Sequence, residues 1–311
     1  MSEMREVVVV VHTGREEAVS AAQDVVSLLL EANICPLIVD GHREDGGPSP
    51  VLVEALGEDS ERVHWLDMDR RPSTAELVVV LGGDGTILRA AELVREDRTP
   101  LLGVNLGRVG FLAEKEREDI EEAVARVVDR QYSVEERQTL DVTVISPSGK
   151  TTEMWALNEA TIEKAAREHM LEVVLGIDSS PLSSFGCDGV VAATATGSTA
   201  HAFSAGGPIM WPDVDALLVV PLAAHALFAR PIVVGPKSVL TVDIINENRT
   251  HGLLSCDGRR TLELEPGTQL QIRRGHAPVR LARLSAGPFT DRLVQKFDLP
   301  VVGWRGRRSN V

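Results

Sequence analysis

Continuous apolar runs alternate with amphipathic helical patterns through the first part of the chain, and this alternation limits the fold more than any other feature. Residues 6–11 read EVVVVV, and residues 78–81 and 101–104 form further apolar runs. Such runs are typical of strands that are buried on both faces of a parallel sheet. Strands that alternate with helices predict βαβ units, so we expect an α/β domain with a mostly parallel sheet.

Helical spacing of apolar residues marks the segments between these strands. Apolar residues recur on one face over 18–29, 87–94 and 120–128, which predicts three helices. Residues 42–74 differ, because they are charged, rich in Gly, Pro and Ser, and only weakly periodic. We expect a variable, partly mobile segment there.

The pattern changes near residue 138, where apolar and polar residues begin to alternate. Leu140, Val142 and Val144 alternate with polar residues, and a turn follows at 147–150. Short strands separated by turn residues predict a β-rich second domain. The further strands are expected at 171–177, 232–234, 239–245, 253–256 and 261–264. A short helix is expected at 291–297.

The composition of the chain argues against some classes of function. A length of 311 residues suggests two domains, and a net charge of −14 argues against a general binder of nucleic acid or of anionic membranes. Cys35, Cys187 and Cys256 are too sparse for a metal pair and fit a reducing compartment. No signal peptide is recognisable, and the apolar stretch 216–229 is too short and interrupted to span a bilayer comfortably. We therefore expect a cytoplasmic protein.

A glycine-rich turn follows the apolar run at 78–81. Gly82, Gly83 and Gly85 would let the backbone approach a phosphate closely, and the next helix would present its positive end there. Asp84 stands among them, and a carboxylate beside phosphates can act through Mg²⁺ or accept a proton from an attacking hydroxyl. Both roles belong to phosphoryl transfer. The alternative is a tight strand-to-helix turn in which Asp84 only caps the helix.

Two further segments carry ligand-type chemistry. Residues 185–209 are rich in glycine and hydroxyl side chains and could form a surface for a flat polar ligand. Asn158 and Glu159 follow an apolar run, and an amide beside a carboxylate can bind the vicinal hydroxyls of a ribose. The alternatives are an ordinary loop with a short helix and an ordinary strand end. His169, His225, His251 and His276 are scattered and predict no metal site.

These motifs, taken in order, resemble the NAD kinase family, whose members make NADP with ATP or polyphosphate as donor. The similarity runs from the first strand to about Gly306, and the tail at 288–294 is similar to actinobacterial members. The glycine–aspartate motif alone is shared with related lipid kinases and phosphofructokinases, whereas the full ordered set is specific. The matching segments are 82–86, 105–112, 158–159, 185–189, 196–200, 204–208 and 255–258.

The resemblance implies three parts in the chain. These are a Rossmann-like α/β domain over 1–137, a β-sandwich-like NAD-binding domain over 138–287, and a segment over 288–311 that returns to the first domain. It also implies an active site between the domains, Mg²⁺, NAD with ATP or polyphosphate as substrates, and a homodimer or homotetramer. No nucleic acid or membrane partner is implied.

The resemblance also assigns residue roles. Asp84 would accept the proton of the adenosine 2′-hydroxyl of NAD. Asp188 would reach a substrate base or ribose across a subunit interface, and Asp257 would lie near the ribose hydroxyls. Phosphate contacts are expected from Gly82, Gly83, Gly85 and Thr86. NAD contacts are expected from Asn158, Glu159, Asp188, Thr196, Thr199, Ala200, His201, Ser204 and Asp257.

One loop departs from the family pattern. The family run Thr-Pro-Thr-Gly-Ser-Thr-Ala-Tyr is replaced by TATGSTAH over 194–201. Ala195 removes a rigid proline, and His201 replaces the tyrosine that stacks on a substrate ring. We expect weaker NAD binding as a result. Three alternatives therefore stay open: a lipid kinase, a non-catalytic NADP-binding regulator, and a kinase for a different nucleoside or dinucleotide. His12, Arg15 and Arg108 are weaker candidates for phosphate contacts.

Overall fold

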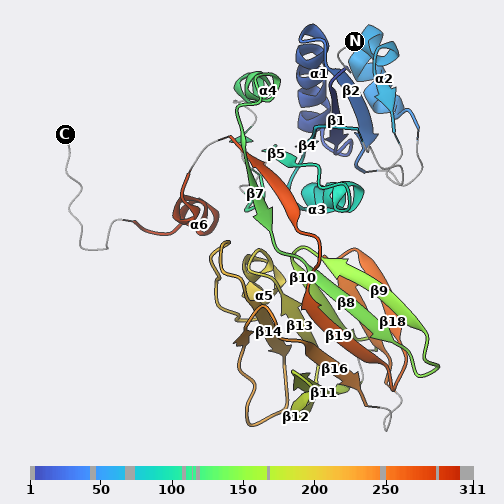
Figure 1. The fold of residues 1–311 in the computed structure, drawn as a ribbon, viewed down its shortest axis with the longest axis vertical. Helices are drawn as coiled ribbons and strands as arrows, with labels where there is room; N and C mark the ends of the chain where they lie inside the picture. The colour runs from blue at the N-terminus through green and yellow to red at the C-terminus, as the bar shows by residue number, and fades with distance from the viewer. Residues whose placement is uncertain are drawn as a thin grey trace. The chain divides into compact units, whose positions relative to one another are not determined.

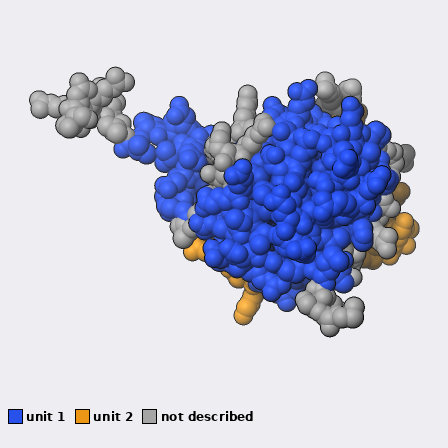
Figure 2. All heavy atoms as spheres, turned by 90° about the horizontal axis from the view of Figure 1, so that it is seen from above, with its two compact units in different colours: residues 1–136, 280–311 blue, residues 137–279 orange. Residues whose placement is uncertain are grey.

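The structure is a computed structural model that describes residues 4–42, 47–66, 74–106, 110–113, 115–116, 120–166, 169–245, 250–284 and 287–301. Contacts within the chain divide it into two compact units, which Figure 2 colours separately. Unit 1 comprises residues 1–136 and 280–311, and unit 2 comprises residues 137–279.

Unit 1 is built on a mostly parallel sheet with the strand order β3-β2-β1-β4-β5-β20-β7, in which β6 also pairs with β5 (Figure 1). The first five strands follow the Rossmann order, which confirms the predicted α/β domain. These five strands pair with one another in parallel. The strands are β1 (Glu6–Val11), β2 (Cys35–Asp40), β3 (His64–Trp65), β4 (Leu77–Leu81), β5 (Leu101–Asn105), β6 (Lys115–Glu116), β7 (Ser133–Arg137) and β20 (Val279–Arg283).

Helices cover this sheet because alternate strand residues face two separate apolar layers. Val7, Val9 and Val11 share one buried cluster with apolar residues of α1, α2 and α4. On β5, Gly103 makes room for α3, since a β-carbon there would lie 2.5 Å from Ile87 Cδ1. The helices of unit 1 are α1 (Glu16–Glu31), α2 (Pro50–Leu56), α3 (Asp84–Val94), α4 (Ile120–Val128), α6 (Phe289–Phe297) and the 3-10 turn η1 (Gly57–Glu61). The three helices predicted from spacing are confirmed.

The 42–74 segment, for which variability and mobility were expected, contains regular secondary structure over its middle part. Helix α2 begins there with Pro50 in its first turn and buries Leu52 and Leu56 against α1. Strand β3 then pairs with β2. The helix is too short for its periodicity to stand out from the surrounding polar residues. Residues 43–46 and 67–73 lie outside the described part of the chain.

Strand β20 also differs from the sequence expectation, which grouped residues 280–284 with the second domain. Leu281 of β20 pairs in parallel with Leu101 of β5, so this late segment extends the first sheet. Apolar alternation shows that a strand exists but does not show which sheet it joins, because that choice depends on distant partners.

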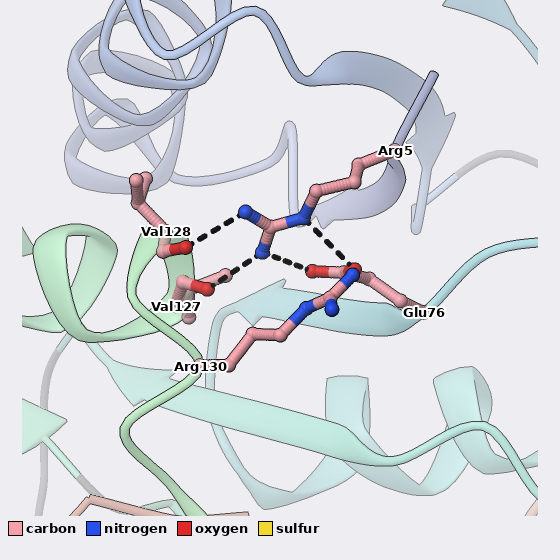
Figure 3. A network of polar contacts seen from close by, with 5 residues as sticks. All are labelled: Arg5, Glu76, Val127, Val128 and Arg130. Carbon is pink, nitrogen blue, oxygen red and sulfur yellow. Dashed lines mark hydrogen bonds and ion pairs between the residues drawn. The ribbon is translucent and has the colours of Figure 1, made fainter. Parts of the chain in front are cut away.

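A charged network ties the start of β1 to the end of α4 (Figure 3). The guanidinium of Arg5 donates to Glu76 at 3.0 Å and to the carbonyls of Val128 and Val127 at 2.7 and 3.0 Å. Arg130 donates to the same carboxylate at 2.9 Å. The last carbonyls of α4 are thus paired with a cation, which also suits the negative end of the helix.

Unit 2 is a sandwich of two six-stranded sheets, with the orders β15-β14-β13-β10-β17-β18 and β12-β11-β16-β19-β8-β9. The predicted β-rich domain is confirmed, and apolar residues from both sheets form its core. The strands are β8 (Leu140–Ile145), β9 (Thr151–Ala156), β10 (Glu159–Lys164), β11 (Leu171–Ile177), β12 (Ser180–Cys187), β13 (Gly189–Ala193), β14 (Leu217–Leu222), β15 (Ile232–Val234), β16 (Leu240–Ile244), β17 (Gly252–Cys256), β18 (Arg260–Leu264) and β19 (Gln269–Arg274).

Strands β13 and β14 were missed in the sequence because they do not alternate. Val190 and Ala192 face the sandwich core, whereas Val191 and Ala193 face a second cluster that contains Ala202. The turn η3 (Gly197–Thr199) and the helix α5 (His201–Ser204) precede and follow Ala200, so the 194–204 segment covers the outer face of this sheet. A strand buried on both faces carries no period-2 pattern.

Candidate functional site

The order of strands in unit 1 identifies where a ligand can bind. The chain runs from β1 to β2 on one side and later enters β4 on the other side, so the topology switches between β1 and β4. In open α/β sheets, ligands bind at the carboxyl ends of the strands at such a switch point. The Gly82–Thr86 turn begins directly after β4, and the His12 N–H donates to the carbonyl of Leu81 at 3.1 Å.

The glycine turn is tightly packed on one side and open on the other. A β-carbon on Gly82 would lie 2.8 Å from Thr86 Cβ, so this glycine is required by the buried threonine. Among the described residues, no atom of another segment lies within 4 Å of a β-carbon placed on Gly83 or Gly85. Gly83 is the N-cap of α3. The start of this helix therefore has space beside two glycines, as a phosphate would need.

Asp84 does not cap its helix, which contradicts the alternative interpretation of this turn. Its side chain makes no capping hydrogen bond, and the cap position belongs to Gly83. Instead, the Phe111 N–H donates to Asp84 Oδ2 at 3.0 Å and the Leu112 N–H donates to Oδ1 at 3.2 Å. The carboxylate is thus oriented by the backbone of a different loop.

The weaker candidates near this turn are differently placed. Burial lowers the pKa of His12, so its ring is neutral at pH 7 and poorly suited to binding a phosphate by charge. Beside it, Thr13 donates to Asp40 at 2.8 Å. Arg108, together with Gly107 and Val109 of the family-like motif, lies outside the described residues.

In unit 2, the predicted Asn158–Glu159 pair lies at the start of β10 and is buried. Asn158 is 8% exposed and Glu159 is 7% exposed. The carboxylate of Asp257 accepts the N–H groups of Leu157 and Asn158 at 2.9 and 2.7 Å. Because β10 and β17 are antiparallel neighbours, Asp257 follows β17 at the end where β10 begins. The structure therefore brings Asn158, Glu159 and Asp257 together.

The guanidinium of Arg260 holds the carboxylate of Asp257 in place. Arg260 donates to Asp257 Oδ2 at 2.7 Å, and its Cζ lies 4.3 Å from the centroid of the Trp155 ring. The side chain of Asp257 is only 1% exposed. Asp257 and Gly258 have φ angles of +54° and +69°, a left-handed turn for which an Asp-Gly pair is favoured. In this geometry Asp257 orients the 157–158 backbone, and its predicted contact with ribose stays a prediction.

The carboxylate of Glu159 is strongly perturbed by its surroundings. Burial raises its pKa to about 7, the charge of Asp257 adds to the rise, and the His201 N–H opposes it by bonding to the carboxylate. Its Oε2 atom is buried and has no hydrogen-bond partner among the described residues. A buried carboxylate with an unused oxygen is suited to accept a hydroxyl from a ligand.

The 194–204 segment packs directly against this cluster. Thr194 donates its hydroxyl to the carbonyl of Leu157 at 2.7 Å, and the Gly197 N–H donates back to Thr194 at 3.1 Å. A β-carbon on Gly197 would lie 2.8 Å from Asn158 Cα. Ser198 receives the N–H of Met210 at 2.9 Å. The segment is thus held in place although Ala195 has replaced the family's proline.

The remaining predicted residues of this segment lie around its outer end. The Nδ1 atom of His201 is 3.4 Å from Thr161 Oγ1, so its ring lies beside β10. The Thr199 hydroxyl donates to the carbonyl of Thr196 at 3.2 Å. Ala200 is half-buried, and Ser204 is exposed at the end of α5. These residues can present a surface to a ligand.

Asp188 is not brought to the cluster. It is exposed and pairs with Lys164 at 2.6 Å, at the opposite end of β10 from Glu159. The register of β10 and β13 separates the two ends by five residues, which is roughly 16 Å along a strand. A contact between Asp188 and the ligand of Glu159 in the same subunit is not supported by this placement.

Several contributing residues were given no role in the sequence. Gly110, Phe111 and Leu112 lie in the matching segment 105–112 but carry no charge that points to Asp84. Trp155 was read only as part of an apolar run, and Arg260 offered only its nearness to Asp257 as a signal. Among the described residues, no group of three or more His, Cys, Asp or Glu side chains could hold a metal ion. No helix in the described ranges is both long and apolar enough to cross a membrane.

Comparison with known proteins covers both units. The model of the ATP-NAD kinase N-terminal domain matches residues 7–132, and that of the ATP-NAD kinase C-terminal domain matches residues 157–284. The chain is 54% identical to an NAD kinase of Leifsonia xyli over 98% of both chains. It is also 54% identical to NAD kinase 2 of Streptomyces coelicolor over 97% of both chains.

Solved structures share the fold at lower identity. Yeast NADH kinase complexed with NADH superposes with a TM-score of 0.81 and 21% identity, over 96% of this chain and 89% of that chain. An NAD kinase from Archaeoglobus fulgidus in complex with ATP gives a TM-score of 0.71 and 23% identity, over 96% of this chain and all of the other. Together with the domain matches and the close relatives, this shows that the chain belongs to the NAD kinase family.

Proposed function

We propose that the protein is an NAD kinase that transfers the γ-phosphoryl group of ATP to the 2′-hydroxyl of the adenosine ribose of NAD, forming NADP and ADP. One observation supports this above all. At the topological switch point, a half-buried carboxylate, Asp84, is held by two backbone N–H groups beside the open backbone of Gly83 and Gly85. The family membership supplies the chemistry that such a turn would perform.

In this mechanism, Asp84 acts as the general base. Its carboxylate takes the proton of the ribose 2′-hydroxyl while the 2′-oxygen forms a bond to the γ-phosphorus. The bond between the γ-phosphorus and the bridging oxygen breaks, and ADP leaves with that electron pair. Proton transfer of this kind contributes roughly 10²–10⁴ in rate. The two backbone donors keep the carboxylate in one orientation, which favours productive geometry.

The glycine turn would bind the donor's phosphates. The free N–H groups at the start of α3 and the positive end of that helix attract anions. Mg²⁺, when bound, would neutralise phosphate charge, and it prefers to arrive with phosphates and only one or two protein carboxylates. The open backbone of Gly83 and Gly85 would hold the phosphates that carry the cation.

The cluster in unit 2 would bind NAD. The unused buried oxygen of Glu159 can accept a ribose hydroxyl, and Asn158 offers an amide next to it. His201 lies close enough to Glu159 to affect both its charge and the neighbouring surface. The Archaeoglobus fulgidus NAD kinase, which was solved in complex with ATP, supports ATP as donor. Polyphosphate as donor, the homo-oligomeric state and a cytoplasmic location stay predictions.

The test is NADP formation by the purified full chain with Mg²⁺-ATP and NAD, read with an NADP-specific dehydrogenase. We expect the wild-type protein to form NADP and the Asp84→Asn variant to fold but to lose at least ~100-fold in turnover. Asp24→Asn, an exposed change on α1, is the matched control. Near-normal turnover in Asp84→Asn would remove Asp84 from the base role. Binding of NADP without any ATP consumption by the wild type would instead indicate a non-catalytic regulator.

A further inference from the structure

The 110–112 loop, which binds the Asp84 carboxylate, is itself held by residues near the C-terminus. Phe111 and Leu112 are 7% and 3% exposed, and their N–H groups donate to the two oxygens of Asp84. Their carbonyls point to other partners. Arg292 Nη1 of α6 donates to the Phe111 carbonyl at 3.1 Å, and Arg283 Nη1 donates to the Leu112 carbonyl at 3.3 Å.

Aromatic packing adds a second contact between α6 and this loop. The ring of Phe111 lies 5.8 Å, centroid to centroid, from the ring of Phe289 and from that of Phe297. These two residues are the first and last of α6, so the helix spans the ring of Phe111. Tilted aromatic pairs at this distance are favourable beyond the area that they bury.

Other contacts leave the loop little freedom on the side of Asp84. A β-carbon on Gly110 would lie 2.7 Å from Asp84 Cγ, so carboxylate and backbone are in direct contact. Arg283 is also fixed, because its Nε donates to Glu135 at 2.7 Å. The 110–112 backbone is therefore held between Asp84 on one side and β20 with α6 on the other.

We propose that α6 is a positioning element for the phosphoryl-transfer site, in which Arg292, with Phe289 and Phe297 around Phe111, fixes the backbone donors that orient the Asp84 carboxylate. This inference rests on the proposed function, since it assigns α6 an effect on the base. Arg292 acts through the Phe111 carbonyl and is a positioning residue. It changes how often Asp84 is correctly placed for the 2′-hydroxyl, and it leaves substrate binding unaffected.

The test is a double-mutant cycle on NADP formation by the full chain. Arg292→Ala should lower kcat about tenfold, with KM values for NAD and ATP within about twofold of wild type. Arg292→Lys should recover part of kcat, because lysine keeps one donor. In the Asp84→Asn background the same Arg292→Ala change should have no further effect on kcat, because the carboxylate through which Arg292 acts is already absent. Gln295→Ala, an exposed change on α6, is the control.

A second measurement covers the case in which Arg292→Ala folds poorly. Phe297→Leu keeps an apolar side chain but removes one ring from Phe111, and it should lower kcat while hydrogen exchange of the Phe111 and Leu112 amides becomes faster. An unchanged kcat in these variants, or an equal loss with and without Asp84, would overturn the positioning role. Full activity of Asp84→Asn alone would instead overturn the proposed base, and the exchange rates would still decide whether α6 holds the loop.

Discussion

Gly110 leaves free the space that the Asp84 carboxylate occupies, so that a β-carbon at position 110 would lie 2.7 Å from Asp84 Cγ and 2.9 Å from Oδ2. The next two residues supply the N–H groups that bind this carboxylate. Backbone and side chain thus form one unit whose two halves are 26 or more positions apart in the sequence. The absence of a side chain at 110 is as necessary as the presence of one at 84.

Adding a methyl group at this contact should impair the reaction. Gly110→Ala must displace either the carboxylate or the loop, so we expect kcat to fall at least about tenfold while NAD binding persists. The measurement is steady-state NADP formation together with a melting curve. Gly235→Ala is the control, because no atom lies within 4 Å of a β-carbon at Gly235. Wild-type turnover in Gly110→Ala would mean that the position of Asp84 is not limiting.

A substitution at Gly85 should raise stability while it weakens ATP binding. Gly85 lies in the first turn of α3 with open space around its β-carbon position, so alanine there should stabilise the helix by about 0.5–1 kcal/mol. The same methyl group would occupy the space proposed for the donor's phosphates. We expect a higher melting temperature together with a several-fold higher KM for ATP. An unchanged KM would place the phosphates elsewhere.

Glu159 should make stability fall as the pH rises. Its pKa is about 7 in the folded protein against 4.5 for a free side chain, so the folded state binds more protons than the unfolded state between these values. The contribution of Glu159 to stability is then fully present below about pH 4.5 and is lost as the pH rises past about 7, a change on the order of 3 kcal/mol.

Denaturant unfolding of Glu159→Gln from pH 4.5 to 8 checks this. The variant should gain stability relative to wild type at pH 8 and lose that gain toward pH 4.5. Glu163→Gln, at the other end of β10, serves as the comparison and should follow the wild-type curve. A constant difference between Glu159→Gln and wild type at every pH would contradict the raised pKa.

Glu76 should show the opposite pH dependence. Burial alone would raise its pKa, but hydrogen bonds and charge from Arg5 and Arg130 outweigh that effect and lower it. A carboxyl whose pKa is lowered by folding stabilises the protein above its unfolded pKa of about 4.5, and this stabilisation is lost as the pH falls through the folded pKa. We expect Glu76→Gln to cost about 1–2 kcal/mol at pH 7, and less below pH 4.

The measurement is urea unfolding of both proteins at pH 7 and at pH 3.5. Glu121→Gln, an exposed change in the first turn of α4, controls for the removal of a surface charge. Equal costs at the two pH values would show that the Arg5–Glu76–Arg130 network in Figure 3 does not depend on the ionised carboxylate.

Local patterns in the sequence were sufficient for the framework of both units. Apolar runs predicted β1, β4 and β5, and helical spacing predicted α1 and α3. Both signals are patterns among residues that are close together in the sequence. The glycine turn with Asp84 was predicted to be a phosphate site because it directly follows an apolar strand. The strands of the second unit were predicted from alternation, which β13 and β14 lack because both of their faces are covered.

What surrounds each functional group was decided by the tertiary structure alone. A helix cap was the alternative for Asp84, but its partners come from residues 111 and 112, and partners of that loop come from α6. Glu159 and Asp257 are nearly a hundred residues apart, and they perturb each other only because β10 and β17 are neighbours. Hydrogen-bond partners and burial depend on which distant segments pack together, and a linear pattern of residues does not contain that information.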